Sequence, residues 1–115
     1  MNILTELTAL LTDFGTPFET GHFSDSPPDE YIVIIPIADQ LEMFADNRPQ
    51  AEIQEARLSL YSKSNFMKLR NTLTKALLKG DFTVTDRRYI GFEADTKFHH
   101  YIIEIQKEYE NEEEI

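Results

Sequence analysis

The chain of 115 residues has the length of one domain, and its 41% hydrophobic content excludes a disordered protein. Its 11 Lys and Arg stand against 21 Asp and Glu, so the formal net charge is −10 and a phosphate-binding surface is not expected. The absence of cysteine excludes disulfides, thiolate nucleophiles and sulfur-ligated metals.

The first expected element is a helix over residues 3–14. Asn2 is suited to cap its first turn, Gly15 to follow its last turn, and Pro17 prevents continuation. The apolar residues of one helical stripe are Ile3, Leu4, Leu7, Leu10, Leu11 and Phe14. This stripe predicts a helix that covers one face of a sheet. The N-terminal residues carry no basic leader, and no apolar run reaches about 20 residues, so neither a signal peptide nor a membrane span is expected.

The segment Tyr31–Ile37 is the predicted central strand, because it is apolar at both odd and even positions. Such a strand needs cover on both faces, and Pro36 is expected to loosen pairing on one side. The preceding residues, Phe18–Glu30, have the composition of a loop. After the strand, Leu41–Phe44 is predicted to form a short return arm and Asp46–Pro49 a turn.

Glu52–Ser62 is predicted to be a strand with one buried face, formed by Ala56, Leu58 and Leu60. Ile53 lies out of phase with them. This indicates either a bulge near Gln54 or contact of Ile53 with another subunit.

A second helix is predicted after Ser62 or Ser64, either of which is suited to cap it, and it ends at Gly80. Its apolar face consists of Phe66, Leu69, Leu73, Ala76 and Leu77. Two short strands follow, Phe82–Thr85 and Tyr89–Phe92, separated by a break at Asp86–Arg88. The strand position of Gly91 indicates a bulge.

The last strand is predicted over Phe98–Lys107, after a turn at Ala94–Thr96. Five of the eight residues of Glu108–Ile115 are acidic, so we expect a solvated, mobile tail after a single domain over residues 1–107. The order of elements predicts an α+β two-layer sandwich. In it, two helices pack on one face of a mainly antiparallel sheet of about four or five strands.

The sequence offers little catalytic chemistry, and we predict no enzyme, no cofactor and no metal. His99 and His100 are adjacent in a strand, so their side chains leave by opposite faces, and His22 is distant in sequence. No nucleophile elbow or glycine-rich phosphate loop is present. Glu93 and Glu104 are the nearest candidates for a general acid, but both are expected to alternate outward from strands.

Several segments in this order resemble the tail terminator, or tail completion, proteins of siphophages and prophages, which occupy the head-to-tail joint. These segments are Gly21-His22-Phe23, Pro27-Pro28, Tyr31-Ile32-Val33, Phe44-Ala45-Asp46-Asn47, Arg57-Leu58-Ser59-Leu60-Tyr61-Ser62-Lys63, Tyr89-Ile90-Gly91-Phe92-Glu93 and His100-Tyr101-Ile102-Ile103-Glu104-Ile105. The resemblance implies a non-enzymatic virion protein, present in the host bacterial cytoplasm during assembly. It implies a ring of copies, expected to be a hexamer, that caps the tail tube and contacts the head connector while DNA passes through.

The interface residues that we expect on this basis are Phe23, Met43, Phe44, Arg48, Arg87 and Arg88. Phe23, Met43 and Phe44 lie in the expected loop and arm, where apolar residues are typical of interfaces, and Arg48 lies in the expected turn. The doublet Arg87-Arg88 is expected to pair with carboxylates of a neighbouring subunit. Two other classes stay open. One is an acidic binding module, similar to an antitoxin or immunity protein, that covers a basic partner. The other is a small enzyme with a pocket converging on His99 or Glu93.

Overall fold

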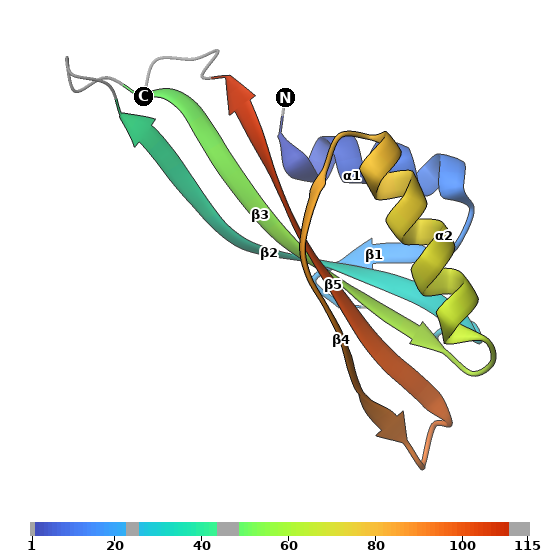
Figure 1. Cartoon of the computed structure of the whole chain (residues 1–115). Coiled ribbons are helices and arrows are strands. Elements are labelled where there is room, and N and C mark those ends of the chain that lie inside the picture. The colour runs from blue at the N-terminus through green and yellow to red at the C-terminus, as the bar shows by residue number, and fades with distance from the viewer. Residues whose placement is uncertain (1, 23–25, 44–48, 111–115) are drawn as a thin grey trace.

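The computed structural model describes residues 2–22, 26–43 and 49–110. Its elements are α1 (Ile3–Phe14), β1 (Phe18–Thr20), β2 (Glu30–Met43), β3 (Pro49–Ser62), α2 (Phe66–Lys79), β4 (Thr83–Glu93) and β5 (Phe98–Glu110). The five strands form one sheet in the order β1-β2-β3-β5-β4, in which β1 runs parallel to β2 and the other pairs are antiparallel. Both helices lie on one face of this sheet (Figure 1), so the predicted α+β two-layer sandwich is confirmed.

The ends of the helices follow local capping chemistry. The Asn2 side chain accepts a hydrogen bond from the backbone N–H of Thr5 at the start of α1. At the start of α2 the cap is Asn65, whose side chain accepts from the N–H of Lys68, so the prediction of Ser62 or Ser64 was wrong. Ser62 instead donates a hydrogen bond to Glu30 at 3.0 Å.

Gly15 ends α1 in a left-handed conformation, with φ of +95°. Replacing Gly15 by alanine is expected to lower the free energy of unfolding by about 1 kcal/mol, because a Cβ disfavours this backbone conformation. No heavy atom lies within 4 Å of the added Cβ, so backbone conformation alone sets the effect. Urea denaturation measures it. Gly91→Ala is the matched control, since Gly91 has equal space and lies outside the left-handed region; equal losses in both variants would contradict the prediction.

The main core lies between the sheet and the two helices. Its buried residues include Leu7 and Leu11 of α1, Leu73 of α2, and the strand residues Leu58 and Ile103. Both helices turn their predicted apolar stripe toward the sheet, because residues three and four positions apart lie on one helical face.

The prediction for Tyr31–Ile37 holds for its first half. Residues 31–34 are buried, and Ile32 to Ile34 pair with β1 on one side and β3 on the other. Past Pro36 the register with β3 shifts by one residue, which leaves Ile37 as a bulge residue that is 44% exposed. Leu41 belongs to the same long strand, so the predicted separate return arm was wrong.

The β3 strand keeps an unbroken register with β5, so the extra residue lies in β2 at Ile37 and not near Gln54. Gln54 is buried on the helix side, where its Oε1 accepts a hydrogen bond of 2.7 Å from the backbone N–H of Ile3. Ile53 points to the opposite face because strand residues alternate. Its contact with another subunit stays a prediction.

Three further boundaries differ from expectation. Phe18–Thr20 is a short strand inside the predicted loop. The β4 strand continues through Asp86–Arg88, where a break was predicted, with Arg88 paired to Ile102. An edge strand tolerates charged residues because both of its faces reach water. The shift between Tyr89 and Gly91 confirms the predicted bulge, and β5 extends to Glu110, beyond the predicted end of the last strand at Lys107.

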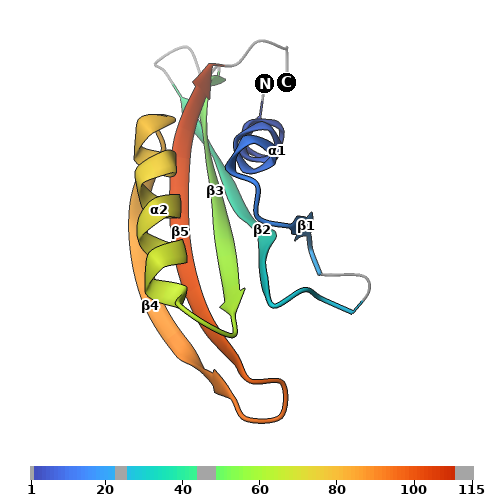
Figure 2. The same ribbon diagram turned by 90° about the vertical axis from the view of Figure 1, so that its right-hand side faces the viewer.

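The molecule is elongated, with principal extents of 54 × 24 × 24 Å. Figure 2 shows α2 beside β5 and β4, and α1 on the side of β1 and β2. The β4–β5 hairpin extends past the helices at one end, and the long strands β2 and β3 extend past them at the other (Figure 1). Within the described ranges, neither helix has the length and hydrophobicity that crossing a membrane requires.

Candidate functional site

The β4 strand forms one edge of the sheet. It pairs with β5 on one side, and among the described residues no strand pairs with its other side. Tyr89, Ile90 and Phe92 of this strand are all about half exposed. Free backbone groups and exposed apolar side chains together are typical of a strand that another chain covers.

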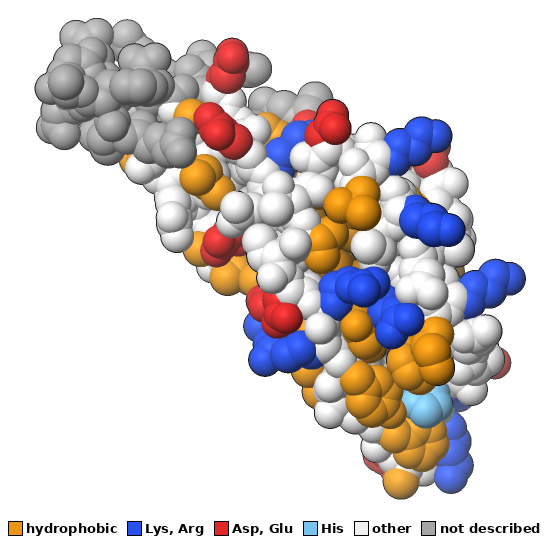
Figure 3. Space-filling view, in the orientation of Figure 1, with side chains coloured by type: hydrophobic (Ala, Val, Ile, Leu, Met, Phe, Trp, Pro, Cys, Tyr) orange, Lys and Arg blue, Asp and Glu red, His pale blue; other side chains and the backbone are white. Residues whose placement is uncertain are grey.

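Four aromatic side chains gather where β4 passes the start of α2, and we call Phe66, Tyr89, Phe92 and His99 the edge cluster. The Phe66 ring centroid lies 5.2 Å from that of Tyr89 and 5.0 Å from that of His99. Phe92 lies 4.9 Å from His99, and the Tyr89 hydroxyl lies 2.9 Å from His99 Nδ1. Figure 3 shows hydrophobic side chains concentrated at this end of the molecule.

The second open edge is the outer side of β2 beyond the short strand β1. β1 pairs only with residues 32–34, and no strand among the described residues pairs with the outer side of β2 after that point. Ile37 and Leu41 are exposed along this stretch, and so is Asp39. The sheet therefore ends in two unequal open edges, one at β4 and one at β2.

The sheet face opposite the helices carries a row of stacked rings at paired positions of β2, β3 and β5. Tyr31 stacks on Tyr61 with centroids 4.7 Å apart, and Tyr61 stacks on His100 at 4.3 Å. Phe98 meets Tyr31 edge-on at 5.3 Å. Burial raises the pKa of Tyr31 to about 12, with smaller contributions from Tyr61 and Glu93. Tyr31 and Phe98 are buried in this row, and Tyr61 and His100 are partly buried.

His100 makes the stability of this face depend on pH. Burial lowers the pKa of His100 below its ordinary value of 6.5; the charge of Glu93 opposes the shift and that of Arg57 adds to it. The unfolded chain therefore binds a proton more readily than the folded chain. The contribution of His100 to stability is complete above pH 6.5 and is lost as the pH falls from there through the lowered pKa.

We expect the urea midpoint of the wild type to decrease as the pH is lowered from about 7.5 to about 5. The decrease should be smaller in His100→Gln, because glutamine cannot titrate. His22→Gln is the control, because this exposed histidine has no described ring or hydrogen-bond partner. An identical fall in His100→Gln and in the wild type would contradict the assignment to His100.

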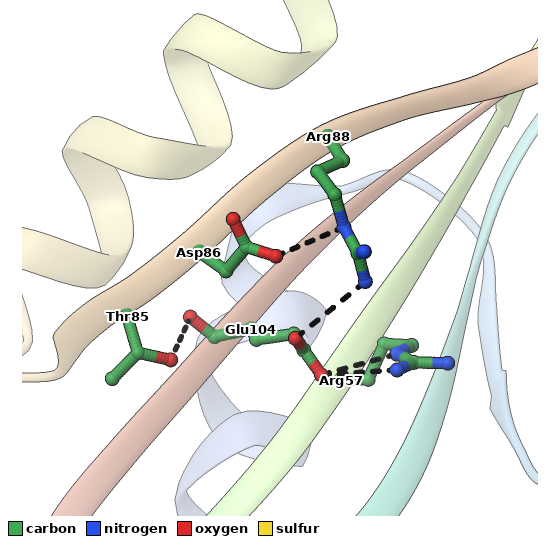
Figure 4. Close-up of polar contacts among 5 residues, drawn as sticks. All are labelled: Arg57, Thr85, Asp86, Arg88 and Glu104. Atoms are coloured by element: carbon green, nitrogen blue, oxygen red, sulfur yellow. Dashed lines mark hydrogen bonds and ion pairs between the residues drawn. The ribbon is translucent and has the colours of Figure 1, made fainter.

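A charged network lies farther along the same open face (Figure 4). Glu104 Oε2 accepts hydrogen bonds from Arg57 Nε at 3.3 Å and Nη2 at 3.1 Å. Arg88 Nη2 lies 4.0 Å from Glu104 Oε1, and Arg88 Nε lies 2.9 Å from Asp86 Oδ2. The network ties β3, β5 and β4 together and engages Arg88 within its own chain. The pairing of Arg88 with a neighbouring subunit stays a prediction.

The structure describes only some of the other predicted interface residues. Phe23, Phe44 and Arg48 lie outside the described residues, and Met43 is the last residue of β2. Arg87 lies on the helix side, where its Nη1 is 3.4 Å from Thr74 Oγ1.

The sequence points to His99 only as a candidate catalytic residue, and it does not predict the rest of the edge cluster or the exposed residues of β2 as an interface. A usable signal was the run Tyr89–Phe92, which is apolar at consecutive positions although charged residues flank it. A strand that is apolar on both faces needs cover on both, and an edge strand at the end of the sheet lacks it.

His99, His100 and Glu93, which were considered for catalysis or metal binding, all contact other side chains. His99 and His100 lie on opposite faces, as predicted, the first against Phe66 and the second against Tyr61. Glu93 is exposed and accepts a hydrogen bond from Thr96 at 2.8 Å. In the described part of the chain, no three His, Asp or Glu side chains gather in a way that could hold a metal ion.

A hollow of about 600 Å³ lies between the end of α1 and the start of α2. Its lining residues are Phe14, Thr16, Glu30, Ser64, Asn65, Lys68, Leu69 and Thr72. The carboxylate in this lining, Glu30, accepts a hydrogen bond from Ser62. Within the described residues the hollow holds no histidine and no second carboxylate, so it offers no acid–base pair.

No protein-family model matches this sequence, and a search of curated proteins finds no match either.

Proposed function

We propose that the protein is a structural component of a phage or prophage virion, which caps the tail tube and joins it to the head connector as a ring of copies. Two features support this proposal: the resemblance to tail terminator proteins described above, and the sheet with two open edges. The observation that carries most weight is the β4 edge, where free backbone groups lie beside the half-exposed Tyr89, Ile90 and Phe92. Such an edge suits a protein that acts by contact with other chains.

The proposed role is not enzymatic. The carboxylates considered for catalysis are held in other contacts: Glu104 by Arg57, and Glu93 by Thr96. A role in assembly requires only surfaces that other chains can bind, and the two open edges of the sheet supply such surfaces.

Electron microscopy of the purified protein mixed with tail tubes of the same virus tests the proposal. We expect added density at one end of each tube, and no further elongation when fresh tube protein is supplied. Tubes alone, and tubes with an unrelated acidic protein of similar size, are the controls. Bare tube ends and continued elongation in the presence of the protein would overturn the proposed role.

A second candidate is the acidic binding module, which a specific observation favours: residues outside 66–97 carry 17 acidic and 4 basic side chains. Such a surface suits a basic protein partner. A stable one-to-one complex with a small basic protein encoded beside it, together with bare tube ends, would replace the tail role by this one.

A further inference from the structure

The charges of this chain are separated along the sequence. Residues 66–97, which comprise α2, β4 and part of the following turn, contain seven Lys or Arg and four Asp or Glu, a net charge of +3. The remaining residues contain four Lys or Arg and 17 Asp or Glu, a net charge of −13. In the fold, α2 and β4 lie together at one edge of the sheet (Figures 1 and 2), so the separation becomes a spatial one.

Most cations at this edge are not neutralised within the chain. Arg88 is engaged by Asp86 and Glu104, but the other six form no ion pair with any described residue. These six are Lys68, Arg70, Lys75, Lys79, Arg87 and Lys97. We call this surface, with the edge cluster, the basic edge. Figure 3 shows Lys and Arg side chains along this side and just above the hydrophobic end.

The opposite edge has the complementary character. Helix α1 contains Asp13 and no Lys or Arg, and its other acidic residue, Glu6, is paired with Lys107 at 2.7 Å. On β2, Asp39 is exposed and forms no ion pair with a described residue, and Ile37 and Leu41 are exposed on either side of it. We call the outer side of β2 after residue 34 the acidic edge.

We propose that the basic edge of one copy binds the acidic edge of a second copy, head to tail, with β4 against the outer side of β2. Three properties match across this contact: the signs of charge, an exposed apolar group on each side, and free backbone donors and acceptors on each strand. Pairing of β4 with β4 of another copy would place two surfaces of the same positive charge against each other, which opposes a symmetric dimer. A head-to-tail contact repeats, so it produces a closed ring or a filament.

This inference rests on the self-association in the proposed function and names its contact, but it does not depend on a tail tube. Salt gives a first signature. Exposed ion pairs are screened within about 8–10 Å at physiological ionic strength, so the contact is expected to weaken as salt rises.

Site-directed cross-linking tests the contact, because the chain contains no cysteine and each introduced thiol is unique. One protein carries Phe92→Cys at the basic edge, and a second, of different mass through its tag, carries Leu41→Cys at the acidic edge. A short bifunctional maleimide is added to the mixture and to each protein alone. Ala9→Cys is the control partner, since Ala9 is exposed on α1, on the side of Gly80 and Phe82, and belongs to neither edge strand.

We expect the mixture of Phe92→Cys and Leu41→Cys to give several times more cross-linked product than any sample with Ala9→Cys. The yield should fall when salt rises from about 0.05 M to about 0.5 M. Efficient cross-linking of Phe92→Cys with itself would show a symmetric contact and overturn the proposal. A mixture that does not exceed the Ala9→Cys control would overturn it as well.

Charge-reversing substitutions in the same cross-linking pair give an independent test of the contact. Adding Arg87→Glu to the Phe92→Cys protein, or Asp39→Lys to the Leu41→Cys protein, should lower the yield about two- to fivefold, as expected for surface ion pairs. Combining the two altered proteins should restore it. Lys63→Glu, which makes the same charge change outside residues 66–97, is the control and should leave the yield unchanged.

An equal loss in the Lys63→Glu control would show an effect of net charge alone and overturn the pairing. The outcomes also separate the two proposals. Specific cross-linking with bare tube ends leaves the head-to-tail contact standing and removes the tail role. Capped tubes without specific cross-linking remove this contact and leave the tail role.

Discussion

Replacing Ile103 by alanine is expected to lower the free energy of unfolding by about 2–5 kcal/mol, the largest single effect predicted for this protein. Ile103 is fully buried in β5, between its neighbours β3 and β4, and faces the helices. Truncation removes three carbons from a packed site and leaves a cavity that the surrounding side chains fill only in part. Urea denaturation followed by circular dichroism measures the loss.

Ile90→Ala is the matched control for this prediction. It makes the same chemical change in the neighbouring strand β4, but the Ile90 side chain is 51% exposed. We expect its effect to stay within about 1 kcal/mol, since half of its surface already contacts water. Similar losses in the two variants would show that the core does not lie between sheet and helices as described.

Replacing Tyr61 by alanine is expected to lower the free energy of unfolding by about 3 kcal/mol, although Tyr61 lies on the face without helices. Its ring stacks between Tyr31 at 4.7 Å and His100 at 4.3 Å, and it meets Phe98 edge-on at 6.2 Å. The substitution removes both stacked contacts at once, so three partners lose packing.

Tyr61→Phe separates the ring from the hydroxyl in this prediction. It keeps the stack and is expected to cost less than about 1.5 kcal/mol. The same urea denaturation measures both variants. A loss of stability in Tyr61→Ala no greater than that in Tyr61→Phe would mean that the ring row contributes little to the fold.

The helices and the fold class are predictable from the sequence because their signals are local. The stripe of α1 repeats with helical spacing, and both Asn2 and Gly15 act within one turn of its ends. The alternation of Leu58 and Leu60 likewise reports a buried face without knowledge of the partner strands.

The features that the sequence does not predict depend on contacts between segments that are distant along the chain. β1 is three residues long and exists because Phe18–Thr20 meets Ile32–Ile34 of β2, which no periodic pattern announces. Gln54 is buried because the start of α1 lies over it and supplies a donor at 2.7 Å. A polar residue in a buried position therefore looks like an interruption of the strand until its partner is known.

The candidate site was the least predictable part, for a related reason. Apolar residues in loops are a common sign of interfaces, so Phe23 and Phe44 were selected ahead of strand residues. The position of β4 at the end of the sheet, which exposes Tyr89 and Phe92, is a property of strand order. Strand order follows from the packing of the whole chain and cannot be read from a single segment.

The extra residue in β2 affects the shape of the strand without changing which residues pair. Pro36 pairs with Ala56 and Ala38 with Glu55, so Ile37 is an insertion that has no counterpart in β3. Removing Ile37 would keep every neighbouring pair and every side-chain direction beyond it, but it would relax the local coiling that a bulge imposes. A chain without Ile37 would therefore direct the part of β2 beyond the bulge along a different line while it presents the same side chains.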